Sequence, residues 1–224
     1  MKHIGKSLAS TALALTLALT ACGAKTLPLK AENGGYYDAQ NNVSYVMAPM
    51  CYEPQGIGDV YASFQSGSSK VILYRVEGLA PTQWLTEEYS GASSMFVASD
   101  IALPDLAGFA PDTIHLCVQS ISVWEFATVT DQDEIDEVVR LFTEGEAVPY
   151  PAKTPDADLR FKFSSPQYPG VYYNLVYVDY GDARYLYDRE THRCVEIGDL
   201  LREYIDGVII TEDETTAETT GQLA

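Results

Sequence analysis

Short runs in which hydrophobic and polar residues alternate occupy much of the chain between residues 59 and 129. Such alternation predicts β-strands that bury one face. Two of these runs, DVYASFQ (59–65) and KVILYRV (70–76), flank SGSS, which predicts a hairpin. The alternation changes phase near Ser120, which indicates a bulge or a bend. The same pattern predicts further strands at residues 94–99, 113–119 and 121–129.

One segment instead repeats its hydrophobic residues with the period of an α-helix. Asp131 precedes it as a candidate N-cap, and Glu134 follows three residues later, which is the spacing of a capping box. Gly145 provides a stop after the last turn. The sequence therefore predicts a helix over residues 132–144. The hydrophobic residues that fall on one face of this helix are Ile135, Val138, Val139 and Phe142.

The C-terminal third returns to strand patterns separated by turn residues. Turns are predicted at Pro169-Gly170 and Gly181-Asp182. The strand at 171–178 is apolar on both faces, which indicates a central strand covered on both sides. A helix is predicted at 198–205, with Asp199 as its candidate cap. Other strands are predicted at residues 158–165, 183–188 and 193–197.

The order of these elements defines a fold class and one domain. Runs of strands with two short helices, about 132–144 and 198–205, predict the α+β class with a mainly antiparallel sheet. Residues 22–35 lack periodicity and are predicted to be a tether. Residues 211–224 are rich in Thr and Glu and are predicted to be disordered. A single domain over 36–210 remains, which is long enough to bury a core.

The first residues have the features of an export signal. Lys2 and Lys6 precede an uncharged run rich in Leu and Ala, at residues 8–19. A positive region, a short apolar core and small residues at its end are typical of a secretory signal. A helix of this length reaches only about 18 Å, against a bilayer core of roughly 30 Å, so it is too short for a transmembrane anchor.

The apolar run ends in Leu19-Thr20-Ala21-Cys22, which resembles the lipobox of bacterial lipoproteins. In that family the signal is cleaved before the cysteine, which carries a thioether-linked diacylglycerol. The resemblance implies a signal peptide over residues 1–21, cleavage before Cys22, and lipidation of Cys22. It also implies an extracytoplasmic protein held at a bacterial membrane, since two acyl chains anchor a protein stably.

The charge of the chain restricts its partners. The sequence has 14 basic and 32 acidic residues, and a net charge of −18. Such a surface repels phosphate backbones, which argues against nucleic acid as a partner. It also repels anionic headgroups, so the lipid alone would hold the protein at the membrane. Cations or cationic polymers remain as partners, and the alternative is that the charge only keeps the protein soluble.

Two His-x-Cys pairs, His115/Cys117 and His192/Cys194, fall in predicted strands. Residues i and i+2 of a strand share a face, so neighbouring strands would bring two imidazoles and two thiolates together as a zinc site. Outside the cytoplasm, the alternative is a Cys117–Cys194 disulfide. A third alternative leaves the thiols reduced and packed, or pairs one of them with Cys51. Apart from this zinc hypothesis, no cofactor is predicted.

Tyrosine is unusually frequent, with 16 residues in the chain. Tyr173 and Tyr177 share a face of one predicted strand, and Tyr185 and Tyr187 share a face of another. Rows of exposed aromatic rings stack on sugars, so these residues are candidates for glycan binding. The alternative is ordinary sheet packing, because tyrosine favours strands and cross-strand aromatic pairs stabilise sheets.

The sequence lacks the motifs of common hydrolases, namely G-x-S-x-G, H-E-x-x-H and S-x-x-K. We therefore expect a non-catalytic binding or interaction module at the cell envelope, whose partner is a protein, a peptide or a glycan. One alternative is a hydrolase of envelope polymers that uses carboxylates or Cys51. The other alternative is a zinc-binding protein that uses the two His-x-Cys pairs.

Overall fold

The structure is a computed structural model that describes residues 29–32, 34–66, 68–89, 92–119 and 123–206. Over these residues the chain has an α+β fold, as the sequence predicts, in which two antiparallel sheets dominate. The predicted signal peptide, Cys22 and the predicted disordered tail all lie outside the described residues. Within the described part of the chain, no helix is long and apolar enough to cross a membrane.

Sheet A is formed by the N-terminal part of the chain and curls on itself. Its strand order is β1-β2-β3-β8-β7-β6-β5, and the two outer strands β1 and β5 contact each other. The curl encloses a small core that includes Tyr45, Leu73 and Phe96. The strands are β1 (Leu29–Glu32), β2 (Gly35–Asp38), β3 (Val43–Met47), β5 (Ile57–Ser66), β6 (Ser69–Val76), β7 (Trp84–Tyr89) and β8 (Ala92–Ala98).

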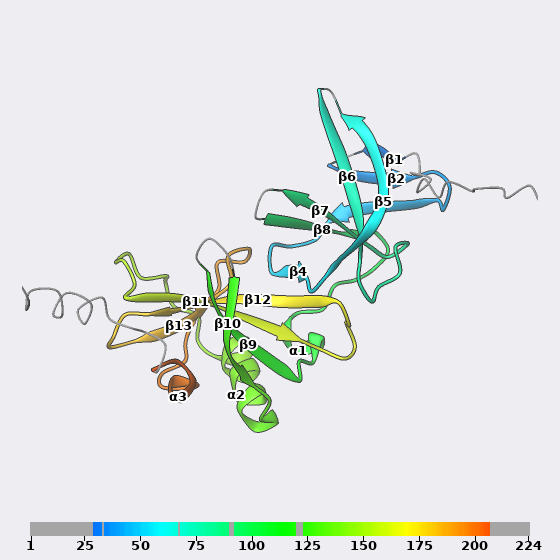
Figure 1. The fold of residues 1–224 in the computed structure, drawn as a ribbon. Coiled ribbons are helices and arrows are strands. Elements are labelled where there is room, and N and C mark those ends of the chain that lie inside the picture. Colours follow the sequence, from blue (N-terminus) through cyan, green and yellow to red (C-terminus); the bar gives the residue numbers. More distant parts are fainter. Residues whose placement is uncertain (1–28, 33, 67, 90–91, 120–122, 207–224) are drawn as a thin grey trace, which may run out of the picture.

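Sheet B is formed by the C-terminal part, with the order β10-β9-β11-β12-β13-β14 and with β4 paired to β12. The three helices gather on one side of this sheet (Figure 1). The helices are α1 (Leu106–Phe109), α2 (Gln132–Glu144) and α3 (Arg202–Ile205). The strands are β4 (Tyr52–Pro54), β9 (Thr113–Gln119), β10 (Val123–Val129), β11 (Ala157–Ser164), β12 (Val171–Asp179), β13 (Arg184–Tyr187) and β14 (Cys194–Glu196).

The two sheets share one large core. Trp84 and Met95 of sheet A are buried in the same cluster as Phe161 of sheet B and Phe142 of α2. Strand β4 links the sheets, because it pairs with β12 and also contacts β8 (Figure 1). Burial of this apolar surface at roughly 25 cal/mol per Å² is the main force that holds the sheets together. Strand β12 is central in sheet B, as its apolar sequence predicts.

Helix α2 spans the predicted residues, but its ends differ in detail from the prediction. The Asp131 side chain accepts hydrogen bonds from the backbone N–H groups of Asp133 and Glu134, so the predicted N-cap is confirmed. The Glu134 carboxylate accepts a hydrogen bond from the Tyr204 hydroxyl, at 2.8 Å. Gly145 ends the helix with an extended backbone, and a Cβ atom there would lie 2.3 Å from the Leu141 carbonyl oxygen. Gly145 is therefore required by close contact rather than by a left-handed turn.

Two predictions of secondary structure are wrong. The tether predicted over 22–35 includes β1 and the start of β2, and Leu29 is buried in sheet A. The helix predicted at 198–205 is only α3, which begins at Arg202 after Leu201 in a left-handed conformation. The carboxylate of Asp199, the predicted cap, instead accepts a hydrogen bond from Arg184 at 2.8 Å.

The bulge or bend predicted near Ser120 lies outside the described residues, and the structure shows a separate irregularity in the β9–β10 pair. The register of this pair shifts between Glu125 and Ala127, whereas the alternation of the sequence changes near Ser120. Residues 120–122 lie outside the described part of the chain. This shift determines which β10 side chains lie on the same face of sheet B as the side chains of β9 opposite them.

Candidate functional site

One face of sheet B carries polar side chains. Along β9, β11 and β12, alternate residues point to the helices and into the core, and the residues between them point to the other side. Lys162 of β11 lies opposite His115 of β9 and Asn174 of β12 in the two ladders. We call this surface the polar face. Its side chains are Glu53, His115, Cys117, Glu125, Arg160, Lys162, Ser164, Tyr172 and Asn174.

An ion pair occupies the centre of the polar face. The Lys162 ammonium, which is almost fully buried, lies 2.8 Å from Glu53 Oε1. The other Glu53 oxygen accepts a hydrogen bond from the Asn174 amide at 3.0 Å, and Arg160 approaches it at 3.6 Å. The Lys162 ammonium also lies 5.2 Å from the centre of the Tyr172 ring. A buried ammonium needs such partners, because its desolvation is otherwise too costly.

A chain of hydrogen bonds lies beside this ion pair. His115 Nε2 is 3.1 Å from Ser164 Oγ, and His115 Nδ1 is 2.9 Å from Glu125 Oε2. The other Glu125 oxygen accepts a hydrogen bond from the Thr128 hydroxyl. The bonds from Thr128 and His115 hold the pKa of Glu125 below its usual value. A hydroxyl, an imidazole and a carboxylate in this order resemble an activated nucleophile with its base and its orienting group.

The surroundings of Ser164 limit what this chain of hydrogen bonds can do. Acyl transfer needs donors that stabilise the oxyanion, and backbone N–H groups usually supply them. The backbone of β11 is instead paired with β9 on one side and β12 on the other. Side chains would have to supply these donors in place of the backbone. The nearest cation on this face, Lys162, is already paired with Glu53. The chain of hydrogen bonds orders the polar face more readily than it catalyses acyl transfer.

The two His-x-Cys pairs do not come together. Strands β9 and β14 are separated by β11, β12 and β13, which places Cys117 and Cys194 roughly 19 Å apart at about 4.8 Å per strand. Both cysteines are free and buried, so the predicted disulfide and the predicted four-residue zinc site are wrong. His192 lies between a turn and β14, with a left-handed backbone conformation, and shares a hydrogen bond with the Tyr187 hydroxyl. Among the described residues, no three His, Cys, Asp or Glu side chains are grouped as metal ligands.

Cys51 is not placed as a nucleophile. Its side chain is buried in the shared core, and burial raises the pKa of its thiol to about 12, with a further contribution from Asp188. Catalysis by cysteine requires the thiolate, which such a pKa excludes near neutral pH. The hydrolase alternative therefore loses this residue.

The four tyrosines predicted to stack on glycans divide into two pairs. Tyr173 and Tyr177 point into the core and are buried, so neither offers a ring face to a sugar. Tyr185 and Tyr187 lie on the opposite side of sheet B and pack against a small cluster around Val176. Among the described residues of sheet B, Trp124 on the edge strand β10 is the exposed aromatic side chain, and it is not one of the four predicted tyrosines.

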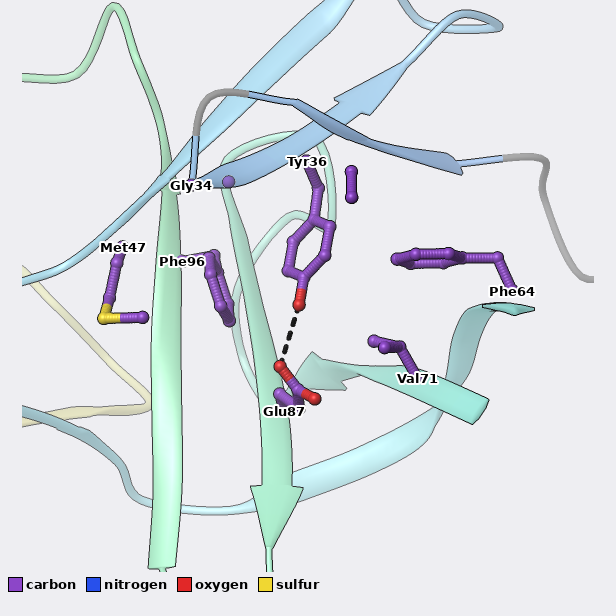
Figure 2. A pocket seen from close by; sticks show the side chains of 9 residues that line it. Gly34, Tyr36, Met47, Phe64, Val71, Glu87 and Phe96 are labelled. Carbon is purple, nitrogen blue, oxygen red and sulfur yellow. Dashed lines mark hydrogen bonds between the residues drawn. The ribbon is translucent and has the colours of Figure 1, made fainter. Parts of the chain in front are cut away.

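Sheet A contains a pocket of about 230 Å³ inside its curl. In Figure 2 the Tyr36 ring lies between Phe96 and Phe64, and its hydroxyl points to Glu87. The ring centres are 4.6 Å apart for Tyr36 and Phe96, and 5.5 Å apart for Tyr36 and Phe64. The hydroxyl donates to Glu87 Oε2 at 2.8 Å. The walls are therefore aromatic and aliphatic, completed by Met47 and Val71, with one carboxylate among them.

The pocket could not be predicted from the sequence for a local reason. Its upper wall is the β1–β2 hairpin, which has no clear alternation and was predicted to be a tether. Gly35 lies at the pocket, and a Cβ there would come within 1.9 Å of the Tyr45 carbonyl oxygen. The pair Gly34-Gly35 was the available signal, since adjacent glycines permit a tight turn and a close strand contact as well as a flexible linker.

No protein-family model, no curated protein and no solved structure matches this chain.

Proposed function

We propose that this chain is a lipid-anchored extracytoplasmic protein that binds a small, largely apolar ligand in the pocket of sheet A. The resemblance of residues 19–22 to a lipobox supports the location. The strongly acidic composition supports a partner other than nucleic acid. The observation that carries the binding role is the pocket itself, because aromatic walls with a few polar groups are typical of small-molecule sites.

Binding suits this pocket better than catalysis does. Its described lining includes the Glu87 carboxylate and the Tyr36 hydroxyl, but no histidine, cysteine, serine or lysine. Nucleophilic or acid–base chemistry needs an activated pair of such groups. A small apolar molecule, by contrast, gains about 25 cal/mol for each Å² of its surface that leaves water.

The test is ligand binding by the mature chain, measured by saturation-transfer NMR and by thermal shift. The probes are small aromatic and aliphatic alcohols together with the corresponding amines. Ala31→Phe places a ring in the pocket and should abolish binding of every probe. Lys30→Phe adds the same ring at the neighbouring, oppositely directed position of β1 and should leave binding intact. Failure of all probes, or binding that survives Ala31→Phe, would overturn the proposal.

A second candidate function is hydrolysis of acyl esters by Ser164. The observation that favours it is the chain of hydrogen bonds from Ser164 through His115 to Glu125. His115 would take the Ser164 proton as Oγ attacks the acyl carbon, and would return it to the leaving alcohol. Water would then release the acid and restore Ser164. Labelling by a fluorophosphonate, mapped to Ser164 and lost in His115→Asn, would support this function, and unlabelled Ser164 would reject it.

A further inference from the structure

Within the described part of the chain, buried charged side chains have well-defined partners, with one exception. Lys162 is paired with Glu53, and Arg184 is paired with Asp179 at 2.9 Å. Asp38 accepts hydrogen bonds from the Tyr61 hydroxyl, the Asn41 amide and two backbone N–H groups. Each charge is therefore compensated, as burial requires. The same holds for Asp188, which accepts from a backbone N–H group and from the Thr191 hydroxyl.

Glu87 is the exception. It is only 7 % exposed, yet across the described residues its carboxylate has one hydrogen bond, from Tyr36, and no basic partner. One phenol compensates for only part of the desolvation of a carboxylate. Glu87 also lines the pocket, so the missing positive partner has a place to bind. In Figure 2 the carboxylate lies directly below the Tyr36 hydroxyl, with Val71 to its right.

We infer that the pocket binds the protonated amino group of a small apolar amine, with Glu87 as its counter-ion. This inference rests on the proposed function, since it names the ligand of the same pocket. The amino group would lie against Glu87, and the hydrocarbon part would contact Phe64, Val71 and Phe96. Aromatic ring faces attract ammonium groups within about 6 Å of the ring centre, which adds to the ion pair.

Other ligands of either charge fit this pocket less well. An anion would meet the Glu87 carboxylate without any basic residue in the described lining. A divalent metal ion takes several oxygen ligands, and the lining offers one carboxylate among apolar side chains. The net charge of −18 further concentrates cations near the protein. A monovalent cation with an apolar body matches both the charge and the walls.

The test compares two ligands of nearly equal shape, 2-phenylethylamine and 2-phenylethanol, by calorimetry at pH 7 and physiological salt. We expect the mature wild-type chain to bind the amine at least tenfold more tightly than the alcohol. Glu87→Gln should reduce this ratio to about threefold or less by weakening amine binding. Glu32→Gln is the matched control, because it removes an exposed carboxylate from the strand that forms the pocket wall, and it should keep the wild-type ratio.

The outcomes separate the inference from the proposed function. Equal binding of the amine and the alcohol by the wild type would overturn the inference and would leave the pocket as a binding site. Binding of neither probe, and of none of their homologues, would overturn both. A reduced ratio in Glu32→Gln would show attraction by general surface charge and would also overturn the inference. The wild-type comparison needs no variant, so it decides the question even if Glu87→Gln fails to fold.

Discussion

Glu53 and Lys162 are 109 residues apart in the chain, and their charged groups meet at 2.8 Å on the polar face of sheet B. The three-residue strand β4 makes this contact, because it pairs with β12 at the point where β12 lies beside β11. Glu53 is thus held opposite Tyr172, within reach of Lys162 and of Asn174. The ion pair fastens a segment from the N-terminal half of the chain to the C-terminal sheet.

Replacement of Glu53 by glutamine should destabilise the protein, because it leaves the buried Lys162 ammonium without an anion. We expect a loss of about 2 kcal/mol in the free energy of unfolding, less than the roughly 3–5 kcal/mol of a fully buried pair, since the Glu53 side chain is 24 % exposed. Urea denaturation measures the change. Glu137→Gln, which breaks an exposed pair with Arg140, is the control and should have no measurable effect.

The stability of the polar face should depend on pH through Glu125. Its pKa is lowered by the hydrogen bond from Thr128 and by His115, so folding favours the ionised carboxylate. The resulting stabilisation is present above the ordinary glutamate pKa and is lost as the pH falls through the lower value in the folded protein. Glu125→Gln should therefore be less stable than the wild type at pH 6, and urea denaturation at a series of lower pH values should show the difference shrinking as the wild-type carboxylate becomes protonated. A difference that does not shrink with falling pH contradicts this account.

The three cysteines of the fold should behave as protected free thiols. Cys51, Cys117 and Cys194 are all buried, and burial raises the pKa of each. A mature chain without Cys22 should therefore show almost no thiol reaction with a disulfide reagent in the native state and three reactive thiols after denaturation. Mass spectrometry of the alkylated, unreduced protein counts them. A cross-linked Cys117–Cys194 peptide would contradict the separation of β9 and β14.

Gly145→Ala should destabilise the folded protein for a steric reason alone. The added Cβ would lie 2.3 Å from the Leu141 carbonyl oxygen and 2.8 Å from a methyl group of Val195, although φ is an ordinary −62°. We expect a destabilisation of about 2 kcal/mol, measured by urea denaturation. Gly198→Ala is the contrast, since nothing lies within 4 Å of its Cβ but φ is +59°. It should lose only about 1 kcal/mol through backbone strain. Equal losses would show that the contact at Gly145 is relieved by movement of the helix end.

Elements with a strong local pattern could be predicted from the sequence. Helix α2 has the predicted bounds, because its apolar face and the Asp131 cap agree with each other. Strand β9 was predicted at its observed residues, and the predicted hairpin corresponds to β5 and β6. Strand β1 was not predicted, because only Leu29 among its residues is buried and the next three are exposed. A strand of this kind is specified by its partner rather than by its own pattern.

The candidate sites could not be predicted from local sequence patterns, because each combines residues from separate strands. His115 was selected for its spacing from Cys117, but its functional groups meet Glu125 and Ser164, which come from two other strands. No sequence pattern indicated a binding role for Glu87, because its position at the pocket depends on the pairing of β7 with β6 and β8. Only the folded chain shows that Glu87, a buried carboxylate, has a single hydrogen bond and no basic partner among the described residues.

Leu29, the first residue of β1, is buried in sheet A, so the segment between it and Cys22 limits how far sheet A can lie from a lipid anchor at Cys22. Seven peptide units separate Leu29 from Cys22, and they span at most about 25 Å by any path. With Cys22 lipidated, as we propose, the attachment point of sheet A is confined to that height above the membrane. Counter-ions gather at anionic headgroups within about 8 Å of the surface at physiological salt. The sheet whose hairpin forms one wall of the pocket would therefore be attached at most about three screening lengths from the membrane surface.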